Sequence, residues 1–252
     1  MILVDKNRER VDYSASSLEL VEDCIAFHKG PFSKAWLEAL FIVSQKPWVG
    51  TKILELGASG ESVISPMFAK HGSEITVSCY ETAELPALEA CVKALCIRHE
   101  INSSLFTFKQ IDCFAIADEK YDLIITNRMV GGLSRDHDFN VFKKSIDAIR
   151  ANLTNTGWAL IVDKAQPIFP FSQLIQKFGS AGRNHWHYFS NAELEKLYEK
   201  KTRVVPIKRY GFLSVGNFNG GFLEKTLDRI DGTIEKYFRN KFGPVYLAVL
   251  KK

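Results

Sequence analysis

The chain has 252 residues, of which 46% are apolar and 25% charged, and its formal net charge is +4. This is the composition of a globular protein that is long enough to bury a full core, and so mild a charge gives no argument for nucleic acid as a partner. The five cysteines are scattered without metal-site spacing, so we expect reduced thiols in a cytoplasmic protein and no metal site.

No stretch of the sequence has the pattern of a secretion signal or a membrane span. The first four residues are apolar, but the charged run 5–10 follows at once, which is not the pattern of a signal peptide. No run approaches the ~18 apolar residues that a spanning helix needs. We therefore expect a soluble protein without a membrane span.

The first fifty residues predict a helical cover. Apolar residues recur at helical spacing between positions 15 and 45, in one stripe around Leu20 and a second around Trp36. Gly30 and Pro31 separate the two stripes, because this dipeptide breaks a helix. We therefore expect two helices before the first strand.

Strands and helices alternate from residue 52 onward. Short apolar runs predict strands at 52–57, 74–80, 105–111, 121–126 and 158–163. Between them the pattern predicts a helix at 61–70, a helix capped by Thr82, and a helix at 138–152, with residues 155–157 as a turn. Alternation of this kind predicts an α/β fold with a doubly wound, mostly parallel sheet covered on both faces.

The tail departs from this alternation. It contains predicted helices near 191–200 and 222–237 and a last apolar run at 245–250. A late strand of this kind often runs antiparallel at or near a sheet edge. We therefore predict one domain over 1–252, with 1–50 as the helical N-terminal cover, 51–165 as the ligand-binding core and 166–252 as a C-terminal lid or substrate region.

Residues suited to ligand binding follow every strand of the predicted core, where a doubly wound sheet binds its ligands. They are Glu55, Gly57 and Gly60 after the first strand, Glu81 after the second, Asp112 and Cys113 after the third, Asn127 and Arg128 after the fourth, and Asp163 and Lys164 after the fifth. An acid after the second strand can accept both hydroxyls of a ribose, and one after the third can accept from an exocyclic amine. Turn amides after the first strand can bind a carboxylate.

This arrangement resembles the class I S-adenosylmethionine-dependent methyltransferases over about residues 50–165. Residues 55–61, Glu-Leu-Gly-Ala-Ser-Gly-Glu, look like the first motif of that family, and 121–127 and 153–161 are similar to its fourth-strand and helix-turn-strand motifs. The resemblance implies S-adenosylmethionine as the cofactor. The cofactor-binding residues that it implies are Glu55, Gly57, Ala58, Gly60, Glu81, Asp112, Cys113 and Asn127.

The first motif departs from the family at two positions. Ser59 stands where the second glycine is expected, and Glu61 stands where the third is expected. These changes motivate an alternative, a non-catalytic member of the fold that acts as a scaffold or partner subunit. A dinucleotide oxidoreductase is a further alternative, because it also needs glycine after the first strand and an acid after the second, although the Gly-x-Gly-x-x-Gly spacing is absent.

The substrate motifs of several family subgroups are missing. The four residues from Asn127 lack the prolines and the aromatic residue of the enzymes that methylate base or glutamine amines. Residues 127–138 lack the glutamates of arginine methyltransferases, and 163–166 lack the carboxylate cluster of the metal-assisted catechol type. We therefore expect a different, metal-independent acceptor.

Residues 184–194 resemble a stretch of small-molecule O-methyltransferases, in which a histidine precedes an aromatic residue, a capping serine and a helix with a Glu-Leu pair. Ser190 and Glu193 have the spacing of a capping box. Histidine titrates in the range needed to remove a proton from an acceptor hydroxyl. The candidate general bases are His185 first, His187 second and His137 third.

The sequence thus predicts methyl transfer from S-adenosylmethionine to a hydroxyl group of a small molecule. A sugar or glycan precursor is preferred, because aromatic residues and histidines in the tail suit such ligands. Arg183, Lys164 and Arg128 could bind an anionic substrate or remain solvated charges. We expect no nucleic acid partner, and a homo-oligomer is compatible with this reading.

Overall fold

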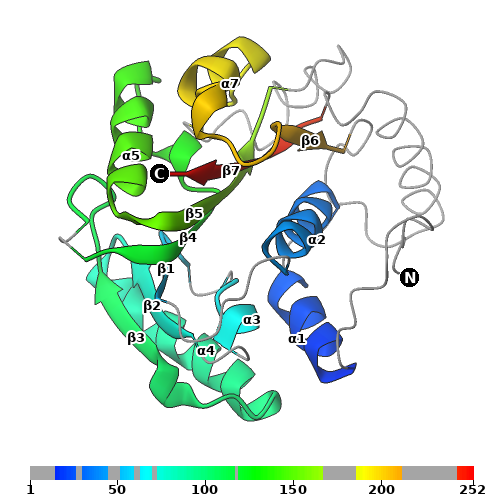
Figure 1. Ribbon diagram of the computed structural model, residues 1–252. Coiled ribbons are helices and arrows are strands. Elements are labelled where there is room, and N and C mark those ends of the chain that lie inside the picture. Colours follow the sequence, from blue (N-terminus) through cyan, green and yellow to red (C-terminus); the bar gives the residue numbers. More distant parts are fainter. Residues whose placement is uncertain are drawn as a thin grey trace.

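The fold is built on one mostly parallel sheet. The computed structural model describes residues 15–26, 30–44, 52–59, 63–69, 73–116, 119–166, 186–211 and 243–252. In this part of the chain seven strands form a sheet with the order β3-β2-β1-β4-β5-β7-β6 (Figure 1). The strands are β1 Lys52–Leu56, β2 Glu74–Cys79, β3 Phe106–Gln110, β4 Tyr121–Asn127, β5 Leu153–Lys164, β6 Lys208–Tyr210 and β7 Val245–Lys251.

Strands β1 to β5 are parallel, and β7 runs antiparallel to both β5 and β6. The predicted doubly wound sheet with a late antiparallel strand is therefore confirmed. The strand order reverses between β1 and β4, which pair from Ile53 with Leu123 to Leu56 with Thr126. A reversal of this kind opens a crevice at the carboxyl ends of the two strands, where such folds bind ligands.

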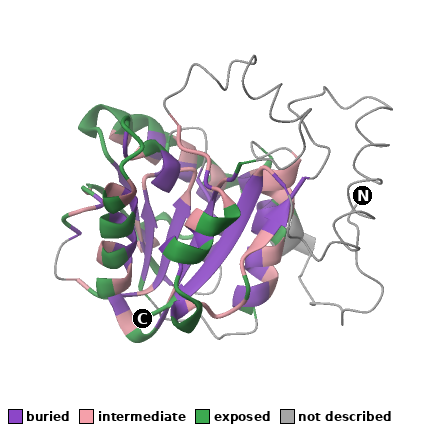
Figure 2. Ribbon diagram, turned by 90° about the horizontal axis from the view of Figure 1, so that it is seen from above, coloured by how far each residue is buried: buried purple, intermediate pink, exposed green. Residues whose placement is uncertain are grey.

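Helices cover both faces of this sheet, and each face has its own apolar cluster (Figures 1 and 2). Side chains alternate along each strand, so Ile53 belongs to one cluster and Leu54 to the other. One face packs against α1 Ala15–Ile25, α2 Pro31–Ser44, α3 Pro66–Ala69 and α4 Leu85–Arg98. The other face packs against α5 Phe139–Ala151 and α7 Asn191–Leu197.

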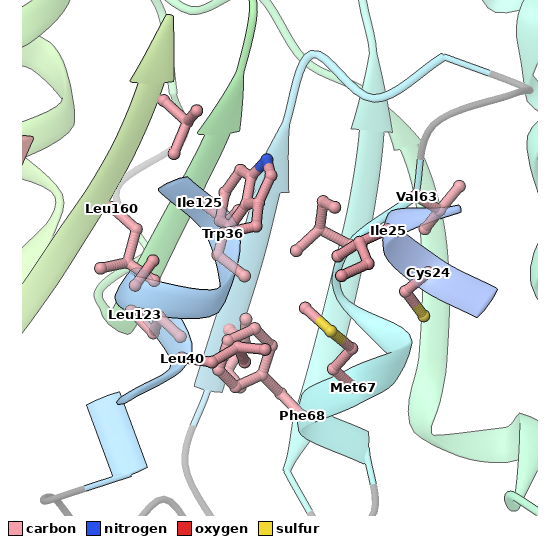
Figure 3. Packing of buried hydrophobic residues seen from close by; sticks show 14 of the residues in the cluster. Cys24, Ile25, Trp36, Leu40, Val63, Met67, Phe68, Leu123, Ile125 and Leu160 are labelled. Carbon is pink, nitrogen blue, oxygen red and sulfur yellow. The ribbon is translucent and has the colours of Figure 1, made fainter. Parts of the chain in front are cut away.

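The predicted helical N-terminal cover is confirmed. Gly30 separates α1 from α2 in the left-handed conformation, with φ of +63°. Trp36 is fully buried and belongs to the same apolar cluster as Leu123 of β4 and Leu160 of β5 (Figure 3). Helix α2 of the cover packs mainly on β5, β6 and β7, and its Trp36 reaches the end of β4 through a hydrogen bond to Asn127.

Three local predictions are corrected in the core. The helix predicted at 61–70 has only Pro66–Ala69 as helix among its described residues. Thr82 does not cap a helix, because its hydroxyl donates to the side chain of Gln110 at 2.6 Å. The predicted turn 155–157 lies inside β5 as an irregular bulge, since pairing with β4 passes from Leu153 to Trp158.

In the C-terminal region, the helix predicted near 191–200 is present as α7, and it packs beside α5 through Leu194 and Leu197. The short edge strand β6 was not predicted at all. Residues 167–185 and the helix predicted near 222–237 lie outside the described residues, as does most of the predicted lid.

A buried arginine fixes this end of the sheet. Arg209 of β6 is 2% exposed and donates to the carbonyl of Gly243, the side chain of Asn191 and the carbonyl of Gln166. Burial lowers the pKa of Arg209 to about 10. The guanidinium therefore joins β6 to the start of β7, the start of α7 and the segment after β5.

Loss of a large core side chain gives a test of this packing. Phe142 of α5 is fully buried against the sheet and lies edge-on to Phe189, with ring centroids 5.0 Å apart. Phe142→Ala should lower the free energy of unfolding by about 3–5 kcal/mol, through lost burial and the cavity left behind. Urea denaturation measures this change. Asn140→Ala, on an exposed position of the same helix, should change it by less than about 0.5 kcal/mol.

Candidate active site

The turn after β1 depends on one glycine. Gly57 has φ of +74°, and a Cβ atom there would lie 3.0 Å from both Cγ and Sδ of Met129. Both the backbone conformation and the close approach of Met129 therefore require glycine. The next amide, that of Ala58, donates to the carbonyl of Ser78 in β2 at 2.7 Å, so it is used within the protein.

Glu55 stabilises the same turn through hydrogen bonds to backbone amides. Its carboxylate is buried and accepts from the amide of Ile64 at 2.9 Å and from that of Ser65 at 2.8 Å. Burial raises the pKa of Glu55, and these hydrogen bonds oppose the effect. Because its oxygens are engaged, this geometry assigns Glu55 to shaping the turn between β1 and α3, while Gly60 lies outside the described residues.

Two acids stand at the ends of β2 and β3, which are neighbours in the sheet. Glu81 is exposed, and its carboxylate makes no hydrogen bond to any residue that the structure describes. Asp112 is also exposed and accepts from the amide of Phe114 at 2.9 Å, which fixes the loop after β3. Cys113 is buried, and burial raises the pKa of its thiol to about 12, so it stays protonated at neutral pH.

An exposed aromatic side chain lies beside Glu81. Tyr80 is 70% exposed, although most large apolar side chains of the described chain are covered. The sequence analysis did not identify this residue. An aromatic residue directly before an acid at a strand end is the pattern that would have indicated it. A ring in this position can stack on a planar ligand group.

The end of β4 is tied to the N-terminal cover. The side-chain oxygen of Asn127 accepts from the indole Nε1 of Trp36 at 3.1 Å. The next residue, Arg128, has φ of +49° and places its guanidinium 4.6 Å from the ring centre of Phe32. Helix α2 therefore contributes aromatic side chains to the crevice, and burial there lowers the pKa of Arg128.

The end of β5 carries a buried carboxylate next to a half-buried ammonium. Asp163 accepts from the amide of Gly131 at 2.9 Å, the indole Nε1 of Trp186 at 3.0 Å and the amide of Lys164 at 2.7 Å. Burial raises the pKa of Asp163, and these hydrogen bonds oppose that shift. The Nζ atom of Lys164 lies 4.7 Å from the ring centre of Trp186 and 5.5 Å from that of Tyr188.

Two of the three candidate histidines, His137 and His187, lie close together in the described part of the chain. His185 lies outside the described residues. The Nε2 atom of His187 is 3.1 Å from Glu193, and its ring centre lies 4.9 Å from that of Phe142 on the α5 face. His137 is exposed, with its ring centre 5.2 Å from that of His187. This packing favours a structural role for His187, because its ring belongs to the aromatic cluster between α5 and α7.

The comparisons with known proteins give matches at the level of structure. No protein-family model matches the chain, and no curated protein matches its sequence. Phosphoethanolamine N-methyltransferase 2 of Haemonchus contortus, in complex with phosphomonomethylethanolamine and S-adenosylhomocysteine, has a TM-score of 0.59 and 12% identity, covering 96% of this chain and 59% of that one. Magnesium protoporphyrin IX methyltransferase of Synechocystis, with bound SAH, has a TM-score of 0.58 and 12% identity over 92% of this chain and 86% of that one.

This chain has the class I methyltransferase fold. The strand order and the matched structures both support this fold. Because the sequence identities are only 12%, the similarity shows the fold alone. Gly57, Glu81 and Asp112, which the family resemblance implies as cofactor contacts, follow β1, β2 and β3 in this fold. No described helix is long and apolar enough to cross a membrane. The described residues also contain no cluster of three His, Cys, Asp or Glu side chains that could hold a metal ion.

The burial of His187 makes stability depend on pH. Burial lowers the pKa of His187, an effect that Glu193 partly offsets. The folded state then binds fewer protons than the unfolded chain, whose histidine pKa is about 6.5. The stability linked to His187 is therefore fully present above about pH 6.5 and is lost as the pH falls through the lower folded pKa.

Urea unfolding of the wild type and of His187→Gln at pH 5, 6 and 7 tests this effect. The difference in unfolding free energy between the two proteins should grow as the pH rises, because only the wild type gains stability when its histidine loses a proton. A difference that stays constant over this range would show that the pKa of His187 does not change on folding.

Proposed function

We propose that this protein transfers a methyl group from S-adenosylmethionine to a hydroxyl group of a small molecule. The observation that carries the proposal is the exposed carboxylate of Glu81 at the end of β2. It stands in a fold that matched structures share, some of which hold S-adenosylmethionine or its demethylated product. An unpaired acid at this strand end is suited to accept from both hydroxyls of a ribose.

The other residues around the crevice fit the remaining parts of this cofactor. Asp112 has a second carboxylate oxygen left to accept from the adenine amine, since Oδ1 takes the amide of Phe114. Tyr80 offers a ring to the adenine plane, and the left-handed Gly57 lets the backbone approach the ligand closely. S-adenosylmethionine, when bound, supplies a methyl group on a positively charged sulfur.

The chain must align the acceptor and remove its proton. We keep His185 as the proposed general base, because residues 184–194 resemble small-molecule O-methyltransferases and because His187 is engaged with Glu193. His137 is a weaker candidate, since it lies beside His187 on the α5 side. Asn127 joins the end of β4 to α2 through its hydrogen bond with Trp36. A sugar acceptor stays a prediction.

Calorimetric titration with S-adenosylhomocysteine tests the cofactor site. Glu81→Gln should weaken binding by about 10- to 100-fold, because the ribose hydroxyls would then donate to a neutral amide instead of a charged carboxylate. Glu84→Gln is the matched control, an exposed glutamate three residues further along the same segment, and should bind like the wild type.

Three results would contradict parts of this proposal. Equal affinity of Glu81→Gln and the wild type would remove Glu81 from the site. Failure of the wild type to bind S-adenosylhomocysteine at millimolar concentration would contradict the enzyme and favour a scaffold with this fold. Binding of a nicotinamide cofactor in its place would favour the oxidoreductase.

A further inference from the structure

The glycine of the turn after β1 is covered by a side chain from another strand end. Gly57 follows β1 and Met129 lies in the loop after β4, so the two residues meet where the strand order of the sheet reverses. A Cβ atom on Gly57 would stand 3.0 Å from both Cγ and Sδ of Met129, and its three nearest atoms all belong to that side chain. The thioether therefore packs against the turn that a ligand at this reversal approaches.

Backbone hydrogen bonds hold the chain on both sides of Met129. The amide of Arg128 donates to the carbonyl of Val162 in β5 at 2.8 Å, and the carbonyl of Met129 accepts from the amide of Gly132 at 3.0 Å. Arg128 has φ of +49°, a left-handed conformation that is uncommon for a residue with a side chain. Between them, the chain turns from its pairing with β5 back toward β1, which places Met129 over Gly57.

The side chain of Met129 can move while this backbone stays in place. It is half-buried against the apolar cluster on the α5 face, whereas Val130 beside it is fully buried. Methionine is unbranched and has three rotatable bonds, so it adapts its shape more readily than other apolar residues. A rotation about these bonds would uncover Gly57 without breaking a backbone hydrogen bond of the loop.

A cofactor in the proposed site competes with Met129 for the space beside Gly57. The proposed ribose and adenine contacts, Glu81 and Asp112, follow β2 and β3 on one side of β1, and Met129 enters from β4 on the other side. A ligand that binds Glu81 and extends over Gly57 toward β4 would meet the thioether. The close approach to Gly57 that the proposed function needs is therefore possible only when this side chain moves.

We propose that the side chain of Met129 is a gate over Gly57, which rotates away when S-adenosylmethionine binds and closes again when the product leaves. The proposal rests on the methyl-transfer function proposed above, because it concerns access to that same site. The closed gate makes apolar contacts that are lost on opening, so it lowers both the association rate and the affinity of the cofactor.

Calorimetry and stopped-flow binding of S-adenosylhomocysteine to the full-length protein test the gate. If the open form is about a tenth of the wild type, Met129→Ala should bind about tenfold more tightly, mainly through faster association, because all of its molecules are open. Met129→Phe should associate more slowly than the wild type, since a bulky ring with fewer rotatable bonds clears the glycine less readily. A residue that instead forms a wall around the bound ligand would give weaker binding of Met129→Ala through faster dissociation.

Leu133→Ala is the matched control. Leu133 lies in the same loop after β4 and is also a half-buried residue packed against the apolar cluster on the α5 face. Its atoms are not among the three nearest to the Cβ position of Gly57. This variant should bind S-adenosylhomocysteine like the wild type, and thermal unfolding confirms that each variant is folded.

Methyl NMR observes the movement of the gate in the wild type. The chain has three methionines, and ¹³C-methyl labelling of methionine gives one signal for each. The signal of Met129, identified by its loss in Met129→Leu, should move toward the shift of a solvent-exposed methionine at saturating S-adenosylhomocysteine. The signal of Met67, which is 5% exposed in α3, should change less.

Two outcomes would overturn the proposal. One is folded Met129→Ala binding S-adenosylhomocysteine no faster and no more tightly than the wild type, and the other is a Met129 methyl signal that stays in place at saturation. In both cases the ligand binds, so the methyl-transfer function stands while the gate fails. If Met129→Ala binds and the wild type does not, the gate stands and the function proposed for the wild type fails. If neither protein binds, both proposals fail.

Discussion

The buried carboxylate of Asp163 is the constraint on which the structure at the end of β5 depends. A carboxylate removed from water is costly unless donors surround it, and here the donors come from three places in the chain. The amide of Gly131 belongs to the loop after β4, and the indole of Trp186 belongs to the segment before α7. Both segments are therefore held at the end of β5, and Trp186 is brought against Lys164.

The same physical solution recurs at two other strand ends. Glu55 is buried after the first apolar run and gathers the amides of Ile64 and Ser65, while Arg209 gathers carbonyl groups around β6. In each case a buried charge is satisfied mainly by backbone groups, which are thereby fixed around it. By contrast, the carboxylate of Glu81 after β2 is exposed and makes no hydrogen bond to a described residue.

Much of the fold followed from local pattern, and the failures have local causes. Apolar runs marked β1, β2, β4 and β7 within a residue or two, because a strand that is buried on both faces needs a continuous apolar stretch. The helix predicted at 61–70 begins at Pro66 in the described residues. The amides of Ile64 and Ser65 donate to Glu55 and so do not take part in helical hydrogen bonds. Strand β6 has three residues, two of them basic, and such a segment has no periodicity to detect.

By itself, the sequence determined the order of strands and helices and the residues that follow each strand, since hydrophobic periodicity and turn residues act over short distances. Only the tertiary structure decided which of those residues are left for a ligand, because partners distant in the chain engage some and not others. Asn127 bonds to Trp36, 91 residues away, and Glu55 turns inward to the amides before α3, whereas Glu81 remains open. His187 has the right chemistry for a base, but aromatic packing and Glu193 hold it on the α5 face.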